Sequence, residues 1–351
     1  MEPGFADNFE KQLTAERQKV DVAVHNFSVR ELVRMMVDGE LNAAPAYQRQ
    51  FRWDEEGESL FIESVFLGLP APPIFVATNV GYQWEVVDGV QRLSTLAHFL
   101  AEDNEAANKV RRETPLVLKG LEKLSDLNGA SYAELPRNIQ VYFGRQPLQI
   151  ISLTDKSDLL VRFDVFERLN RGGIRLTPQE VRACVYRGKF NDFIEKLAED
   201  ESFNSLLKLK QTQQHDGTII EEVLKYFAYK NFRERFDGKI EKWLNRYMGA
   251  ATKEFDYRRE EKTFNRATSF LHEVCDGPFM RSGSNVTPVV QFEACLVSIA
   301  ELLQEGKTPV APPAGWQDDS ELRASSGAGS NAKQMLIRRL ARAKELFGGE
   351  A

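Results

Sequence analysis

The first half of the chain alternates between helical spacing of apolar residues and short β-branched runs. Helical spacing predicts a helix over roughly 29–37 behind the capping box of Ser28 and Glu31, a second that Asp54 can cap and that runs to about Leu69, and a third from 91 to 100. Runs of β-branched and aromatic residues predict a hairpin of strands 74–78 and 84–88, and a later strand at 148–153. Between the helix ending at 100 and the strand at 148–153 the pattern is polar and irregular, with one short strand expected near 116–118. This order of elements indicates a small mixed-sheet domain of the α+β class.

From Thr177 onward the pattern is almost entirely helical. Thr177, Pro178 and Glu180 combine an N-cap, a proline at the first helical position and a glutamate three residues after the cap, which marks a helix start. A mostly helical domain should therefore follow the mixed-sheet domain. The expected divisions are an N-terminal extension (1–27), the mixed-sheet domain (28–175), the helical domain (176–304), a loose linker or arm rich in Pro, Gly and Ser (305–330) and a basic C-terminal helix (331–351).

Charge and residue spacing exclude several classes of function. The chain has 46 basic and 52 acidic side chains, a net charge of −6, so bulk charge cannot hold it on nucleic acid and any phosphate binding must come from a local site. Neither a membrane-spanning apolar run nor a signal-peptide pattern is present, which predicts a cytoplasmic protein without membrane contact. The four histidines and three cysteines lack the spacing of a metal site or an HNH nuclease.

The most informative stretch is WEVVDGVQRLSTL, in which a strand ends at Asp88, turns at Gly89 and begins a helix. Such a junction exposes backbone N–H groups and the positive end of a helix dipole, which suits phosphate. Arg92 can neutralise the phosphate, Ser94 and Thr95 can donate hydroxyls, and the carboxylate at the strand end can hold a divalent cation or orient a water. The alternative is an ordinary turn and cap with a solvated arginine.

A second cluster, YQRQFRW, gathers polar and aromatic side chains within seven residues. Gln48 and Arg49 can contact phosphate, while Tyr47, Arg52 and Trp53 can stack on or contact nucleic-acid bases. The alternative is that the aromatic residues are core positions of an extended segment.

The third stretch, VFERLNRGGIRLTPQEVRACVYRG over 165–188, places Asn170 at a helix end beside two glycines. This junction can bring a polar side chain to a cleft, or it can be a plain helix C-cap with solvated charges.

Together and in this order, PAYQRQFRW (45–53), VVDGVQRLSTL (86–96) and the 165–188 stretch resemble the N-terminal domain of GmrSD-type restriction proteins, the family with a DGQQR motif. The resemblance implies a ParB/sulfiredoxin-like fold. It also implies binding and hydrolysis of GTP or another NTP with Mg²⁺ in prokaryotic defence against phage or modified DNA. An HNH nuclease then acts on the same chain or on a partner. Because no HNH composition is visible here, we expect a separate nuclease subunit.

The resemblance carries over residue by residue. It assigns Asp88, Gln91 and Arg92 to catalysis, with Asp88 also as the metal ligand. The expected nucleotide-binding set, which includes the two hydroxyl residues suggested by spacing alone, is Gln48, Arg49, Gly89, Arg92, Ser94, Thr95 and Asn170. Val90 stands where the family usually has the first glutamine of DGQQR, which suggests weak turnover.

Two function classes follow from these residues. The leading hypothesis is an NTP-binding and hydrolysing component of a restriction system. The alternative is a DNA-binding or sensor module that does not hydrolyse nucleotide and recruits or regulates a partner nuclease, using YQRQFRW and the basic terminal helix. A nuclease that cuts DNA through a metal at Asp88 ranks last, since no second carboxylate stands at a diagnostic spacing. The pattern leaves the oligomeric state open.

Overall fold

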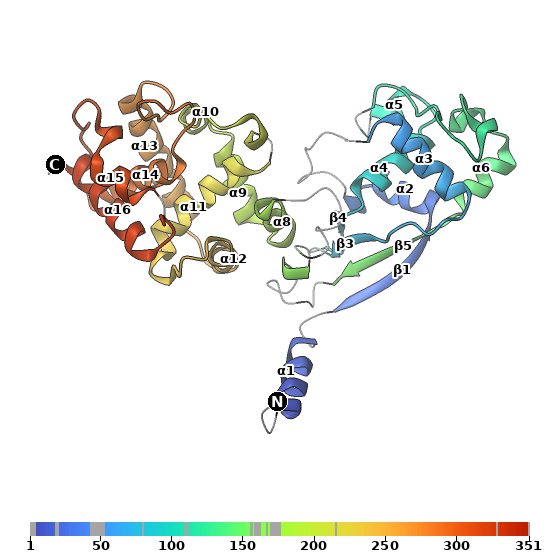
Figure 1. Ribbon diagram of the computed structural model, residues 1–351, viewed down its shortest axis with the longest axis horizontal. Helices are drawn as coiled ribbons and strands as arrows, with labels where there is room; N and C mark the ends of the chain where they lie inside the picture. Colours follow the sequence, from blue (N-terminus) through green and yellow to red (C-terminus); the bar gives the residue numbers. More distant parts are fainter. Residues whose placement is uncertain are drawn as a thin grey trace. The chain divides into compact units, whose positions relative to one another are not determined.

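The computed structural model describes residues 5–17, 21–42, 53–78, 81–108, 110, 112–154, 157, 163–165, 168, 177–214, 216–327 and 329–349. The chain forms two compact units, Met1–Leu176 and Thr177–Ala351, which are drawn in Figure 1. The division lies one residue from the boundary expected between the mixed-sheet and helical domains. No helix in the described ranges combines the length and the apolar character needed to cross a membrane.

Unit 1 is built on a mixed five-stranded sheet. In spatial order its strands are β1 (Val22–Ser28), β5 (Pro147–Leu153), β3 (Ile74–Thr78), β4 (Trp84–Asp88) and β2 (Leu41–Asn42). β1 with β5 and β3 with β4 are antiparallel pairs, whereas β3 with β5 and β2 with β4 are parallel pairs. The predicted hairpin and the strand at 148–153 are confirmed, and so is the α+β class. The likeness to ParB and sulfiredoxin stays a prediction.

The helices of unit 1 begin where the capping residues predict. Ser28 accepts a hydrogen bond from the backbone N–H of Glu31, and Asp54 accepts one from that of Gly57. The described helices of unit 1 are α1 (Phe5–Arg17), α2 (Val29–Val37), α3 (Glu55–Phe66), α4 (Val90–Leu100), α5 (Asn104–Asn108) and α6 (Arg137–Gly144), with short 3₁₀ turns η1 (Ser125–Leu127) and η2 (Tyr132–Glu134). In Figure 1, α2, α3 and α4 lie together over the sheet.

Apolar side chains of α2, α3 and α4 pack with those of the sheet in one hydrophobic core, which includes Leu32, Ile62, Val76, Leu96 and Ile150. This core fixes the end of β4 and the start of α4 in one place. Several elements of unit 1 were not predicted: α1 and β1, which lie in the expected N-terminal extension, the two-residue strand β2, and α5 and α6, which lie in the expected irregular stretch. The short strand expected near 116–118 is reduced to an isolated bridge between Val117 and Ser131.

Unit 2 is helical, as its sequence pattern predicts. Thr177 and Glu180 form the predicted capping box, with the N–H of Thr177 2.6 Å from Oε2 of Glu180. The helices are α8 (Pro178–Val185), α9 (Lys189–Ala198), α10 (Glu201–Ser205), α11 (Thr218–Phe232), α12 (Ile240–Ala251), α13 (Tyr257–Cys275), α14 (Val289–Gln304), α15 (Ser320–Ser325) and α16 (Lys333–Gly348), with 3₁₀ turns η4 (Gln211–Gln213), η5 (Arg233–Arg235) and η6 (Trp316–Asp318).

The segment 305–330 differs from the loose linker expected of it. It contains η6 and α15, and the buried ring of Trp316 lies 5.4 Å from that of Phe279 and 5.1 Å from that of Phe347 between ring centroids. Proline, glycine and serine predict a loose segment locally, but one tryptophan packed among aromatic rings anchors it to unit 2. The C-terminal helix α16 is anchored in the same way, because Leu336, Leu340 and other apolar residues of one face are buried.

Candidate functional site

The junction between β4 and α4 has the geometry of an anion site. Gly89 has φ 97° and ψ 13°, and it precedes α4 without any side-chain cap. The first-turn N–H groups of a helix have no partners within the helix, and they carry its positive dipole end. A Cβ at position 89 would lie 3.0 Å from Cγ1 and 3.3 Å from Cα of Ile74, so both the conformation and the close approach call for glycine.

Asp88 and Arg92 lie side by side at this junction. Nη2 of Arg92 donates to Oδ2 of Asp88 at 2.7 Å, while Nη1 donates to the carbonyls of Pro72 and Pro73. Burial lowers the pKa of Arg92, and the neighbouring carboxylate of Asp88 partly offsets this effect. The arginine expected to bind phosphate therefore already has an anionic partner, so a phosphate must compete with Asp88 for Arg92.

The other residues expected in the junction differ in accessibility. Gln91 lies in the first turn of α4, and its Oε1 accepts from the backbone N–H of Trp53 at 3.4 Å. Ser94 and Thr95 are buried in α4, and Oγ1 of Thr95 has no hydrogen-bond partner among the residues that the structure describes. The structure therefore brings Gln91 to the junction and places the two hydroxyl residues inside the domain.

Most of the second cluster lies outside the described residues, namely Tyr47, Gln48, Arg49 and Arg52, as does Asn170 of the third stretch. Trp53 is described. Its ring packs edge-on against that of Phe61, with centroids 5.6 Å apart, which matches its interpretation as a packed residue of an extended segment.

Asp88 has the chemistry of a single Mg²⁺ ligand. The described residues contain no group of three or more His, Cys, Asp or Glu side chains that could enclose a metal ion. Mg²⁺ at nucleotide sites is held by one or two carboxylates together with the substrate phosphates. A carboxylate that is 35% exposed and has one oxygen on Arg92 fits that role, with the phosphates supplying the other ligands.

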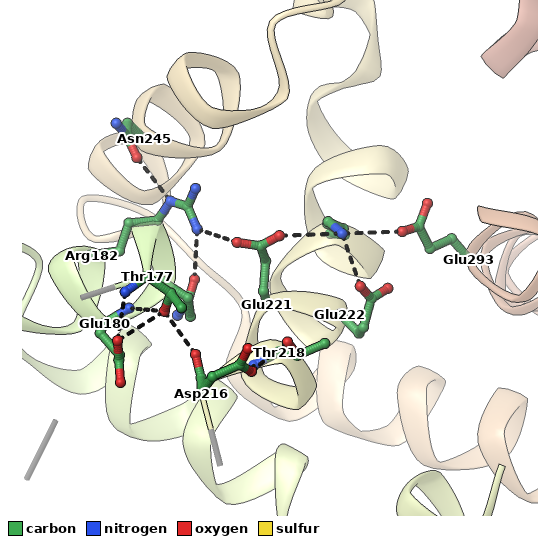
Figure 2. Close-up of polar contacts among 11 residues, drawn as sticks. Thr177, Glu180, Arg182, Asp216, Thr218, Glu221, Glu222, Asn245 and Glu293 are labelled. Carbon is green, nitrogen blue, oxygen red and sulfur yellow. Dashed lines mark hydrogen bonds and ion pairs between the residues drawn. The ribbon is translucent and has the colours of Figure 1, made fainter. Parts of the chain in front are cut away.

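The third stretch ends in a buried polar network, shown in Figure 2. Arg182 of α8 donates through Nη1 to Gln179 and to Glu221, each at 2.9 Å, and through Nε to Asn245 at 2.8 Å. These partners belong to α8, α11 and α12, so one side chain joins three helices. No local sequence pattern indicates this role for Arg182.

Lys225 of α11 extends the network to α14. Its Nζ lies 3.2 Å from Glu221, 2.8 Å from Glu222 and 3.4 Å from Glu293. Burial raises the pKa of Glu222 to about 8, against the attraction of Lys225 and with the help of nearby Glu293. Burial also raises the pKa of Glu221, but Lys225 and Arg182 outweigh it, so its pKa is lowered.

The basic side chains of α16 are engaged within unit 2. Arg338 contacts Glu321 at 2.9 Å, and Arg342 contacts Asp319 at 2.9 Å. The further contacts of this helix join Lys333 to the carbonyl of Glu234, Arg339 to the carbonyl of Ser330, and Lys344 to Glu305. Because these charges meet acidic or carbonyl partners, the helix offers DNA less free positive charge than its sequence suggests.

The comparison with known families agrees with the motifs. Residues 29–187 match the family model described as GmrSD restriction endonuclease, N-terminal domain. No curated protein and no solved structure matches the chain. The matched stretch begins at the first residue of α2, contains the β4–α4 junction and ends just after α8 of unit 2. Residues 29–187 therefore belong to the GmrSD restriction endonuclease N-terminal domain family, and the chain carries a restriction-system domain.

Proposed function

We propose that the β4–α4 junction binds a nucleoside triphosphate together with Mg²⁺ and hydrolyses it, as a component of a restriction system. The observation that carries the proposal is the start of α4 at a left-handed glycine, which has no side chain to cap the helix, with Arg92 and Asp88 beside it. The first-turn amides of a helix and an arginine form a common cradle for phosphate oxygens. The family match adds support, because it covers this junction.

The chemistry follows from an exchange of partners. When phosphate arrives, the guanidinium of Arg92 turns from the carboxylate of Asp88 to the phosphate oxygens, and the carboxylate is released. The released carboxylate can then take the proton of the water that attacks the terminal phosphorus, while the bond to the leaving nucleoside diphosphate breaks. Asp88 would also hold Mg²⁺, which would neutralise charge on the phosphates. Gln91 lies in the first turn of α4, where its amide would orient the same water or an oxygen of the phosphate.

Val90 predicts slow turnover. Its side chain is partly buried and packs against the hydrophobic core of unit 1. A valine has neither the donor nor the acceptor that an amide brings to the transition state, so binding can persist while hydrolysis is weak. This observation favours a second candidate function, in which the domain binds nucleotide or DNA without turnover and regulates a partner nuclease.

Phosphate release tests the first candidate directly. Purified protein is incubated with each of the four NTPs and Mg²⁺, with and without DNA, beside the variants Arg92→Ala and Asp88→Ala. Arg34→Ala serves as the matched control, because this exposed arginine of α2 pairs with Glu31 and Asp38 away from the junction. Turnover that is lost in both junction variants and kept in the control supports the proposal. Full nucleotide affinity in a folded Arg92→Ala variant contradicts it.

Binding measurements address the second candidate. If no NTP is hydrolysed, affinity for nucleotide and for DNA is measured at several salt concentrations. DNA binding through phosphate contacts weakens steeply with salt, because bound counterions are released on binding. Salt-dependent DNA binding without turnover therefore supports a sensor with a separate nuclease partner. Absence of both activities contradicts both candidates.

A further inference from the structure

A closed ring of polar contacts joins the first and third turns of α4 through other segments of unit 1. The N–H of Trp53 donates to Oε1 of Gln91 at 3.4 Å, and the carbonyl of Trp53 accepts from Nη2 of Arg112 at 3.0 Å. The same Nη2 donates to Oε1 of Glu58 at 3.2 Å, and this carboxylate lies 3.1 Å from Nδ1 of His98. Gln91 and His98 both belong to α4, so the contacts close on themselves.

The centre of the ring is unusually buried for a charged group. Glu58 is 0% exposed, and a carboxylate at such depth is costly unless donors surround it. Arg112 supplies one donor. His98 supplies another, and its Nε2 lies 2.8 Å from the carbonyl of Thr114. Both ring nitrogens of His98 thus face oxygen atoms, the carboxylate of Glu58 on one side and the carbonyl of Thr114 on the other.

The ring fixes a residue of the nucleotide motif. Gln91 can reach several rotamers in the first turn of a helix, and each orients its amide differently. The contact with the N–H of Trp53 selects one of them, and Arg112 and Glu58 hold Trp53 in the place that this contact requires. A side chain that is ordered before binding spends less conformational entropy when the ligand arrives.

We propose that Glu58 and Arg112 are positioning residues for Gln91 and set the orientation of its amide at the start of α4. The inference rests on the proposed function, in which Gln91 contacts the nucleotide or the attacking water. Arg112 acts on Gln91 through its hydrogen bond to the carbonyl of Trp53. Glu58 acts through Arg112, and its other contact is with His98. Sequence reasoning missed both, since Glu58 looks like one of several acidic residues in the first turns of α3.

A double-mutant cycle on nucleotide affinity tests the coupling. The affinity for a fluorescent GTP analogue with Mg²⁺ is measured in the full chain and in Gln91→Ala, Arg112→Ala and the double variant, with Arg34→Ala as the control. We expect each single change at the ring to weaken binding by about tenfold, the range of a lost hydrogen bond to a charged group. The double variant should bind no more weakly than either single variant. Additive losses overturn the inference.

Amide exchange at Trp53 tests the ring without nucleotide. The chain has four tryptophans, so labelling with ¹⁵N-tryptophan gives four backbone amides, and Trp53→Phe assigns the relevant one. Exchange at Trp53 should accelerate in Arg112→Ala and in Glu58→Gln, because a neutral amide holds Arg112 less strongly than a carboxylate does. Arg112→Lys should restore part of the protection, because a lysine reaches only one of the two acceptors. Trp243 of unit 2 should not change.

The two measurements separate two kinds of failure. If the wild-type chain binds no GTP analogue and no other NTP, the proposed function fails, and the ring is judged by the exchange at Trp53 alone. If nucleotide binds but the Trp53 amide exchanges equally in all variants, the positioning role is wrong and the proposed function stands.

Discussion

Both units place an arginine on a carboxylate, but they bury the pair to different depths. The side chain of Arg92 is 12% exposed and that of Asp88 is 35% exposed, so water reaches the carboxylate. The side chain of Arg182 is 1% exposed and that of its partner Glu221 is 24% exposed, and Glu221 also holds Lys225. A pair that water reaches can exchange partners at low cost, whereas a buried network that loses one charge leaves others unpaired. Unit 1 therefore has the pair suited to ligand exchange, and unit 2 has the one suited to joining helices.

The charge balance of the buried network strengthens this contrast. Two cations, Arg182 and Lys225, face three carboxyl groups, those of Glu221, Glu222 and Glu293. A proton on Glu222, whose pKa is raised to about 8 by burial, makes the set neutral at neutral pH. The Asp88–Arg92 pair reaches neutrality with two residues and needs no proton. The buried network therefore reaches electrical neutrality by holding a proton, as the burial of charged groups requires.

The largest expected effect is on the stability of unit 2. Arg182→Met keeps much of the side-chain volume but leaves Gln179 and Asn245 without this donor and Glu221 with Lys225 alone, so the free energy of unfolding should fall by about 3 kcal/mol. Arg92→Met is the matched change in unit 1, where water can solvate Asp88, and should cost only about 1 kcal/mol. Urea unfolding of the two variants measures both losses. Equal losses would remove the distinction between the two arginines.

A smaller effect is expected from the proton on Glu222. The folded protein holds this proton up to about pH 8, whereas the unfolded chain releases it near its ordinary value of 4.5. The folded state therefore binds the extra proton between these values, and the free energy of unfolding should decrease as the pH rises from 4.5 to 8. Glu222→Gln imitates the protonated carboxyl and should be more stable than wild type at pH 8 by roughly 2–4 kcal/mol.

Urea unfolding across this pH range checks the expectation for Glu222. The control is Glu321→Gln, which removes an exposed carboxylate from the same unit and should leave the pH slope unchanged. A Glu222→Gln variant with the wild-type slope would show that another group holds the proton.

A third change tests the shape of the junction in unit 1. Gly89→Ala must adopt φ near 97° and place Cβ 3.0 Å from Ile74, so it should cost about 1–3 kcal/mol of unfolding free energy and weaken nucleotide binding. Gly81→Ala is the control, since Gly81 has φ 88° but nothing within 4 Å of its Cβ position. The difference between the two variants measures the contacts of the added methyl group with Ile74 and with Nη2 of Arg92, which lies 3.2 Å from the Cβ position. Equal stability of both variants would mean that α4 can shift away from β3.

Local signals account for what the sequence predicted. The caps at Ser28, Asp54 and Thr177 act within three residues, and the hairpin strands are joined by a short turn. The β1 strand was missed because its partner is far away in the chain: Val22 pairs with Leu153. A half-buried edge strand with histidine and asparagine in it gives a weak pattern of its own.

In the candidate site too, the features set by neighbouring residues were predictable and those set by distant segments were not. The strand, the glycine and the helix start at 88–92 are adjacent in sequence, so their junction was predictable. The burial of Thr95 was not, because the face of α4 that packs inward depends on the surrounding core. Nor were the carbonyls of Pro72 and Pro73 predictable as partners of Arg92, since they come from the loop before β3. Contacts between distant segments, which decide whether a side chain is accessible, have no local signature.

The smallest effect is expected at the surface of α16, where it sharpens the contrast with Arg182. Arg338→Ala removes an arginine that is 55% exposed and paired with the exposed Glu321, so the free energy of unfolding should change by less than about 0.5 kcal/mol. If DNA binds to the chain, its affinity and salt dependence should also stay as in wild type, because this charge already has a partner. Fluorescence anisotropy with a labelled duplex measures both. A marked loss of DNA affinity in Arg338→Ala would show that DNA displaces Glu321, and that an exposed arginine pair of unit 2, like the one in unit 1, exchanges its partner for phosphate.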